Sequence, residues 1–96
     1  MAKLTPNIAN IAEVAKACEE AGADGIVAIN AAGPGMLIDI ARKKPILGAK
    51  RGAVSGPAIR PIAVRCVYDI YETVKIPIIG MGGVTTWQDV VEMMMA

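Results

Sequence analysis

Three glycines within four residues, in the sequence GMGG at residues 80–83, are the first feature that could do chemistry. They follow a run of β-formers and precede Thr85, which has Gln88 three residues later, the spacing of a helix capping box. A glycine turn at a helix N-terminus leaves backbone N–H groups uncovered, and with the helix dipole these groups favour a phosphate. The alternative is a tight turn that only needs glycine for its backbone angles. Two adjacent glycines after a fully apolar strand favour the phosphate interpretation.

A second helix start of this kind lies in the sequence VSGPAIRP at residues 54–61. Gly56 stands just before Pro57, and proline is tolerated in the first turn of a helix because its missing N–H would be unpaired there anyway. Ser55 could add a hydroxyl to a ligand site at this end, or it could cap the helix in the ordinary way. The sequence leaves both interpretations open.

Two polar residues stand at expected strand ends. Asn30 ends an apolar run, where its amide would offer donors and an acceptor to a planar ligand. A turn-forming asparagine is the alternative, and the position favours a functional role. Lys3, in KLTPN, stands alone at another strand end, and by pattern alone simple solvent exposure is the better interpretation.

The chain offers no candidate catalytic residue or metal ligand of the usual kinds. Histidine is absent, which removes the commonest general base near neutral pH. Cys18 and Cys66 lack the spacing of a metal or redox motif. Both fall on apolar helical stripes, so we expect them to be packing residues.

Composition indicates a folded domain without a strong charge preference. Of its 96 residues, 54% are hydrophobic and 20% are charged, and the net charge is +1. This charge gives no general case for nucleic acid or an anionic membrane. No apolar run approaches the roughly 20 residues that span a bilayer, and the N-terminus has no apolar signal-peptide core. We expect a cytoplasmic protein with reduced thiols.

Helical periodicity marks three segments: residues 10–21, residues 58–75 and a segment that starts near residue 85. Asn10 with Glu13 resembles a capping box, and Gly22 is a natural stop for the first helix. The methionines at 93–95 are expected in the core of the third helix.

Short apolar runs between these helices have the length of strands. Residues 25–30 and 76–81 are apolar on both faces, as in parallel strands that helices cover, and KLTPN is a truncated strand end. The order is βα repetition. The long stretch 31–57 needs structure of its own, and its segments 37–40 and 44–47 are expected to pair as a hairpin.

Two further expectations concern the chain as a whole. Two full strands and a strand end cannot close an eight-stranded barrel, so we expect a piece of a larger protein. The residues Arg42, Lys43, Lys44, Lys50 and Arg51 make one loop basic. Such clusters are mostly solvated faces, and a docking surface is the alternative.

Four blocks in order, KLTPN, INAAGPGM, SGPAIRPIAVR and IPIIGMGGV, resemble dihydroorotate dehydrogenase over essentially the whole chain. The resemblance is to the class 1B catalytic subunit, particularly of the archaeal type. It implies an α/β fold of the FMN-linked oxidoreductase type, in which residues 1–96 form a partial (β/α)8 TIM barrel around strands 5 to 7. The family oxidises dihydroorotate to orotate with FMN in pyrimidine synthesis.

The resemblance also implies roles for individual residues. Lys3 would lie at the flavin ring, where its charge stabilises negative charge on the reduced cofactor. Ile29 would contact the flavin through its backbone, and Asn30 with Ala31 would bind the substrate. Gly56, Gly82 and Gly83 would hold the ribityl phosphate end of FMN.

The chain departs from the family pattern in ways that affect activity. Position 31 is alanine where serine or threonine is expected, so one substrate hydrogen bond would be lost. The family's cysteine base and its last Gly-Thr phosphate contact match nothing in this sequence. We therefore expect the isolated chain to be inactive.

The resemblance implies a partner, a second subunit with FAD and a 2Fe–2S cluster that passes electrons to NAD. Exposed sheet edges also predict a homo-oligomer. Two alternatives stay open: a non-catalytic, self-assembling half-barrel that binds phosphate or FMN, and a related flavin barrel enzyme such as the dihydropyrimidine dehydrogenase type.

Overall fold

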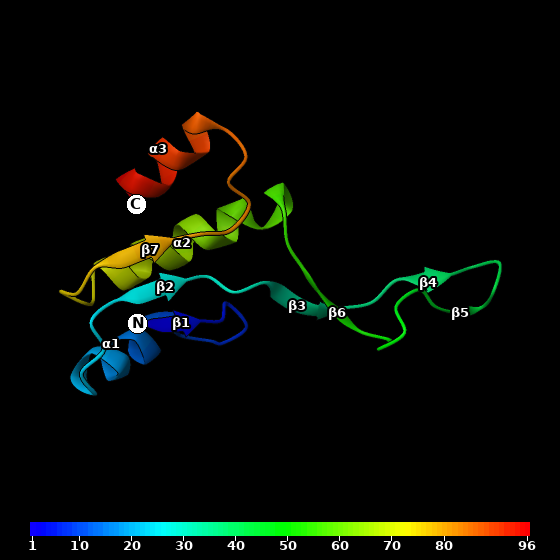
Figure 1. Cartoon of the computed structure of the whole chain (residues 1–96), viewed down its shortest axis with the longest axis horizontal. Coiled ribbons are helices and arrows are strands. Elements are labelled where there is room, and N and C mark those ends of the chain that lie inside the picture. The colour runs from blue at the N-terminus through cyan, green and yellow to red at the C-terminus, as the bar shows by residue number, and fades with distance from the viewer.

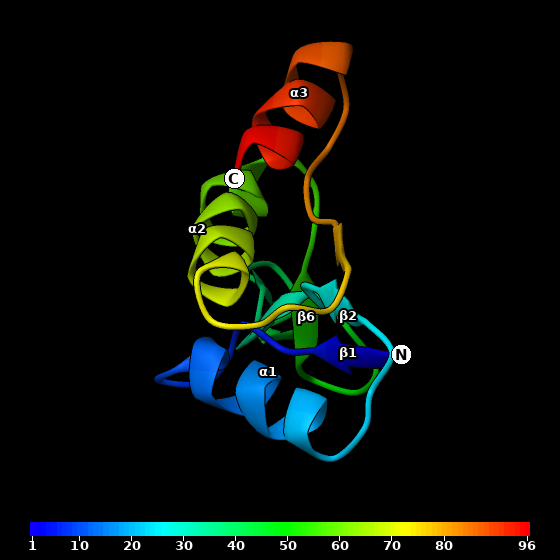
Figure 2. The same cartoon turned by 90° about the vertical axis from the view of Figure 1, so that its left-hand side faces the viewer.

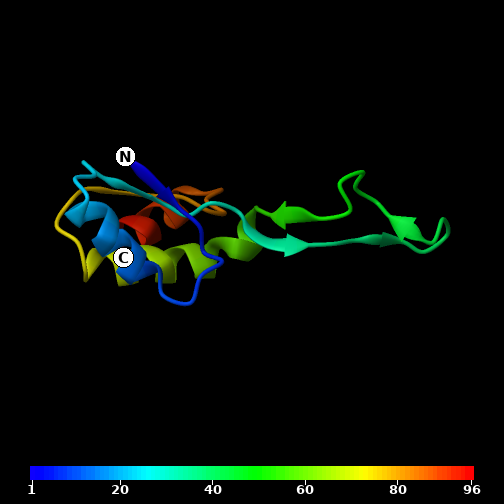
Figure 3. The same ribbon diagram turned by 90° about the horizontal axis from the view of Figure 1, so that it is seen from below.

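The computed structural model describes all 96 residues, Met1–Ala96. A body made of one parallel sheet and three helices carries a long arm, residues 31–55, that projects from one end (Figure 1). The whole chain measures 51 × 32 × 19 Å. Seen from below, the arm continues the long axis away from the sheet and helices (Figure 3). None of the helices combines the length and the apolar character that a membrane span requires.

The sheet confirms the predicted parallel strands. Its strands are β1 (Ala2–Leu4), β2 (Ile26–Ala28) and β7 (Ile78–Gly80), in the order β1-β2-β7. All pairs are parallel, with Leu4 opposite Ala28 and Ala28 opposite Gly80. The carboxyl ends of the three strands therefore lie at one edge of the sheet.

The first helix begins and ends where its sequence predicts. Helix α1 spans Ile11–Glu20, and the Asn10 side chain accepts a hydrogen bond from the Glu13 backbone N–H. Gly22 follows the helix with φ +89°, a conformation that glycine adopts at little cost.

The second helix is shorter than predicted. A 3₁₀ turn, η1 (Pro57–Ile59), leads into α2 (Arg60–Tyr71), so the helix ends four residues before Lys75. Thr73 and Val74 turn the chain back toward β7, with their N–H groups bonded to the Ile70 carbonyl.

The third helix corrects two predictions. Helix α3 spans Trp87–Met95, and its capping box joins Thr86 to Asp89 rather than Thr85 to Gln88. The start is one residue later than predicted, because the Asp89 carboxylate reaches back to the first turn more strongly than an amide would. Only the first of the three methionines is in the core: Met93 is buried, whereas Met94 and Met95 are each 81% exposed.

The helices cover one face of the sheet (Figure 2). The core lies between this face, α1 and α2, and its fully buried side chains include Ile26, Cys66 and Ile70. The other face carries the row Lys3, Val27 and Ile79, which pair across the three strands. Lys3 is exposed and Ile79 is 48% exposed. The helices of this chain therefore cover only one of the two faces of the sheet.

The arm contains two antiparallel pairs. Strand β4 (Ile38–Asp39) pairs with β5 (Lys44–Pro45), which confirms the predicted hairpin. Strand β3 (Ala32–Gly35) pairs with β6 (Gly52–Val54), a pairing the sequence analysis did not predict.

The arm holds five of the ten basic residues and one of the nine acidic residues, so it carries a charge of +4 and the body carries −3. The arm also exposes large apolar side chains, namely Met36, Leu37, Ile38, Ile40, Ile46, Leu47 and Val54.

Candidate functional site

Backbone hydrogen bonds tie the strand ends together beyond the strands themselves. The Asn30 N–H donates to the Leu4 carbonyl oxygen at 2.8 Å, which links the ends of β2 and β1. On the other side, Met81 N–H donates to the Ala28 carbonyl at 2.6 Å, and Ile29 N–H donates to the Met81 carbonyl at 2.9 Å. The segments after β2 and β7 therefore leave the sheet side by side.

Four of the predicted site residues meet beyond this edge. Gly82 lies against Ile29: an ideal β-carbon on Gly82 would fall 3.3 Å from the Ile29 Cγ1 and 2.8 Å from the β-carbon of Ala63. Gly83 lies against Gly56, whose carbonyl oxygen would be 2.6 Å from a β-carbon on Gly83. We call Gly56, Gly82 and Gly83 the glycine cluster.

The glycine cluster needs glycine for its backbone as well as for its contacts. The φ angles are +90° at Gly56, +133° at Gly82 and +73° at Gly83, which other residues rarely adopt. The backbone N–H groups of Gly82 and Gly83 donate no hydrogen bond within the chain. The cluster thus combines free donors, no side chains and the start of η1 and α2, the features of an anion cradle.

The start of η1 tests one of the two interpretations of Ser55, that of an ordinary helix cap. The N-cap residue of η1 is Gly56, and no side chain caps this end. Ser55 is exposed and its side chain forms no capping hydrogen bond, so the interpretation as an ordinary cap is wrong. The positive φ at Gly56 takes the chain into the turn, and a serine one residue earlier is out of register for capping.

Lys3, Asn30 and Ala31 stand apart from the glycine cluster. Lys3 lies on the uncovered sheet face with Val27 and Ile79, and it forms no ion pair. Asn30 is exposed and its side chain forms no hydrogen bond, while Ala31 is half-buried at the base of the arm. Asn30 and Ala31 follow the end of β2, whereas Lys3 is the middle residue of β1, and the three side chains form no hydrogen bond with one another.

Asn7 is a residue that the sequence analysis missed. Its Oδ1 accepts from the Gly33 N–H at 2.9 Å, and its Nδ2 donates to the Ala31 carbonyl at 3.5 Å. It therefore fixes the base of the arm to the segment after β1. The signal was present in KLTPN, where an asparagine follows a proline in a turn.

Asp89 is the second missed residue, and it is buried with 5% exposure. One oxygen, Oδ2, accepts from the Thr85 N–H at 2.9 Å, the Thr85 hydroxyl at 3.0 Å and the Thr86 N–H at 2.9 Å. The other oxygen pairs with the Arg60 guanidinium, whose Nε also lies 3.1 Å from Glu92. The Thr85 backbone N–H is the main cause that lowers the pKa of Asp89 to about 2.

The two cysteines differ in environment. Cys66 is completely buried, and burial raises the pKa of its thiol above the usual 9.0. This confirms its prediction as a packing residue. Cys18 is half-buried at the edge of the core, and the two do not form a disulfide. Nowhere do three or more histidine, cysteine, aspartate or glutamate side chains gather as a metal site would need.

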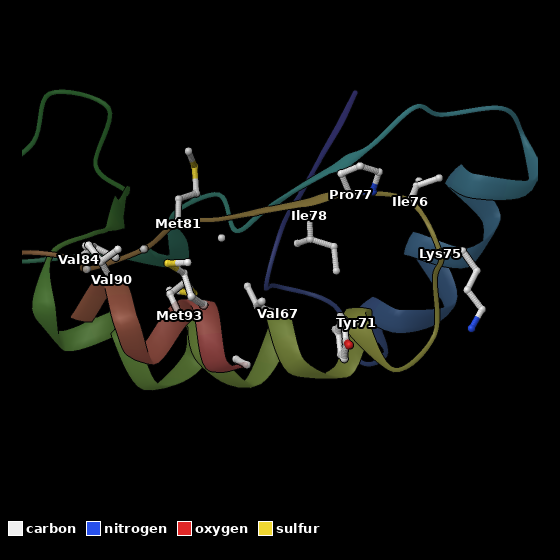
Figure 4. Close-up of a pocket in the computed structure, with 15 residues that line it drawn as sticks. Val67, Tyr71, Lys75, Ile76, Pro77, Ile78, Met81, Val84, Val90 and Met93 are labelled. Atoms are coloured by element: carbon white, nitrogen blue, oxygen red, sulfur yellow. The ribbon is translucent and has the colours of Figure 1, made fainter. Parts of the chain in front are cut away.

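An apolar groove of about 820 Å³ runs between β7 and the helices α2 and α3 (Figure 4). Val67 of α2, Ile78 of β7 and Met93 of α3 lie in the space between strand and helices, whereas Met81 points to the opposite side of the β7 ribbon. Gly82 and Gly83 line one end of this groove. Its walls are mainly aliphatic, so it offers packing rather than polar chemistry.

Comparison with known proteins gives one consistent result. The sequence model of the family described as dihydroorotate dehydrogenase matches residues 1–96. The chain is 56% identical over 94 residues to the catalytic subunit of dihydroorotate dehydrogenase B (NAD(+)) from Methanothermobacter thermautotrophicus. It is 53% identical to the proteins of the same name from Methanosarcina acetivorans, over 94 residues, and Pyrococcus abyssi, over 96 residues. These alignments cover 98%, 98% and 100% of the chain but 31%, 30% and 32% of the relatives. The chain therefore spans about a third of their length.

Proposed function

This chain belongs to the dihydroorotate dehydrogenase family, and from that premise we propose that it is part of a cytoplasmic class 1B catalytic subunit. The activity proposed for the whole enzyme is oxidation of dihydroorotate to orotate in pyrimidine synthesis. The sequence identity of 53–56% to three such catalytic subunits, over nearly the whole chain, supports this proposal. The parallel order β1-β2-β7, with a helix after each strand, supports placing these units around strands five to seven of a (β/α)8 barrel.

The observation that carries the proposal is the glycine cluster. A phosphate group needs donors and close approach to the backbone, and Gly82 and Gly83 supply two unpaired N–H groups without side chains. These residues fit the phosphate end of FMN, with Gly56 at the adjoining helix start. When bound, FMN would supply the hydride acceptor for the reaction.

The remaining predicted residues would act at the ring end of the cofactor and on the substrate. Lys3, the middle residue of β1, keeps a free ammonium group on the open face of the sheet, which suits stabilisation of negative charge on a flavin ring. Ile29 follows β2 directly and would orient the ring through its backbone. Asn30 would present its unpaired amide to the substrate, next to Ala31.

The reaction also needs a proton acceptor, and we propose that it lies outside residues 1–96. The chain has no histidine, and the Cys66 thiol is buried with a raised pKa, so it stays protonated and out of reach. We therefore expect the isolated chain to bind ligand without turning over dihydroorotate.

The relatives' name, catalytic subunit, supports a second subunit, which we propose carries FAD and a 2Fe–2S cluster. The basic arm, with its charge of +4, is the surface of this chain that best suits an acidic partner. The two outer edges of the sheet support self-association as well. A non-catalytic piece that self-assembles and binds FMN is the second candidate, and the open face of the sheet favours it.

The test is an FMN titration of the purified chain after its mass has been verified, followed by fluorescence. We expect saturable binding that Gly83→Ala weakens by at least about tenfold, the equivalent of 1.4 kcal/mol. Gly48→Ala is the matched control, because a β-carbon there meets nothing within 4 Å. Equal binding by both variants would remove the glycine cluster from the site. A change in the flavin spectrum on adding orotate would separate the enzyme fragment from a non-catalytic FMN binder.

A further inference from the structure

We propose that Asp89 is a positioning residue that, through Arg60, holds the Gly82–Gly83 turn over the start of α2. The role in FMN binding rests on the function proposed above, whereas the positioning itself does not. A turn with two adjacent glycines has large backbone freedom, so it needs restraint from outside to keep its donors in one place.

The turn is fixed on both sides. Before it, the Met81 N–H donates to the carbonyl of Ala28, the last residue of β2, and the Met81 carbonyl accepts from the Ile29 N–H. After it, the N–H groups of Thr85 and Thr86 both donate to Asp89 Oδ2 at 2.9 Å. Only residues 82–84 lie between these two anchors, so a shift of Asp89 would be transmitted directly to the glycines.

Arg60 connects this anchor to the other side of the cluster. It is the first residue of α2, and its guanidinium pairs with the second carboxylate oxygen of Asp89. Its own backbone N and Cβ each lie 3.0 Å from the place of a β-carbon on Gly83. The same residue therefore touches the turn directly and holds the carboxylate that restrains it.

An ordinary cap of α3 would not need Arg60. Capping uses the bonds from Thr85 and Thr86 to Oδ2 and the bond from the Asp89 N–H to the Thr86 hydroxyl, whereas the pair with Arg60 uses Oδ1 and joins a different helix. Because Asp89 is buried, leaving Oδ1 without a partner would be costly, so the two contacts act together. Loss of Arg60 should therefore loosen the glycines if Asp89 has a positioning role, and should leave them unchanged if it is only a cap.

The test measures ¹⁵N NMR order parameters of Gly82 and Gly83 in the full chain. We expect order parameters of about 0.85 in the parent and below about 0.6 in Asp89→Asn and Arg60→Gln, the range of flexible backbone. Arg60→Lys should restore most of the order because it keeps the charge. Asp69→Asn is the matched control, since it breaks an exposed Arg65–Asp69 pair on the surface of α2. If Asp89→Asn does not fold, Arg60→Gln still decides, because the Arg60 side chain is 34% exposed.

Each result has a defined meaning. Rigid glycines in Arg60→Gln would overturn the proposal, and so would loosening in Asp89→Asn alone, which is the result expected of a cap. FMN titration of the same variants should show about tenfold weaker binding, the equivalent of 1.4 kcal/mol. Ile70→Val, a core variant in the last turn of α2, should leave FMN affinity unchanged. Absence of FMN binding in the parent would defeat the proposed function, and the order parameters would still decide the role of Asp89.

Discussion

The carbonyl oxygen of Gly56 occupies the space that a side chain on Gly83 would need, because an ideal β-carbon there falls 2.6 Å from that oxygen. The two residues are far apart in sequence, and one follows the arm while the other follows β7. Their contact brings the start of η1 and the turn before α3 together without any intervening side chain. The glycine cluster exists because of this contact.

Gly83→Ala should therefore destabilise the chain more than the backbone angle alone explains. The positive φ costs about 1–2 kcal/mol, and the clash with the Gly56 carbonyl adds about 1–3 kcal/mol of overpacking. Gly22→Ala is the control, since Gly22 has φ +89° but nothing within 4 Å of its β-carbon. Urea denaturation measures both free energies of unfolding. Equal losses for the two variants would mean that Gly56 and Gly83 are not in contact in solution.

Asp89 should make the free energy of unfolding depend on pH in the acid range. Its pKa falls from an ordinary 3.8 to about 2 in the folded chain, so the unfolded chain binds the proton more tightly. The stabilisation is therefore fully present above about pH 4 and is lost as pH falls toward 2. Asp89→Asn should flatten this part of the curve of unfolding free energy against pH, whereas Asp69→Asn should keep it. An unchanged acid slope in Asp89→Asn would show that Asp89 is not the group responsible.

The two cysteines should differ in reactivity toward iodoacetamide. Cys66 is fully buried and its thiol pKa is raised by burial, so its reactive thiolate is scarce and shielded. Cys18 is half-buried at the surface of α1 and should be modified first. Mass spectrometry of the native chain should show one fast modification, which Cys18→Ser abolishes. Rapid double labelling without denaturant would contradict the packing described for Cys66.

The two faces of the sheet should respond differently to truncation. Ile70→Ala, in the core under the covered face, should cost about 2–5 kcal/mol. Ile79→Ala, on the open face, should stay within about 0.5 kcal/mol, as surface changes usually do. Denaturation at several protein concentrations measures both. A large, concentration-dependent loss for Ile79→Ala would show that another copy covers this face in solution.

Much of the fold could be predicted because its signals are local. Apolar runs gave the parallel strands, Asn10 with Gly22 gave the ends of α1, and the pattern at 37–47 gave the hairpin. The pairing of β3 with β6 has no such signal, since AGPG and GAV are poor strand formers. These segments pair because the hairpin between them reverses the chain.

The candidate site shows the same division. Gly56, Gly82 and Gly83 could be found from their types, but their mutual contact depends on how α2 and β7 pack. Asp89 was missed because Thr85 and Thr86 are adjacent and either could start the helix. A shift of one residue exchanges Gln88 for Asp89 as the capping partner, and only the packing of Arg60 against α3 favours the charged one.

The uneven distribution of charge makes the chain a strong electric dipole. Its isoelectric point is about 7.8, yet +4 of charge lies on the arm and −3 on the body, along a molecule 51 Å long. At pH 7.8 and low salt the chain should therefore bind to a cation exchanger by the arm and to an anion exchanger by the body. Salt should release it from both resins, because the Debye length is about 10 Å at 0.1 M. The dipole therefore orients the chain as it approaches a charged surface, before the two make contact.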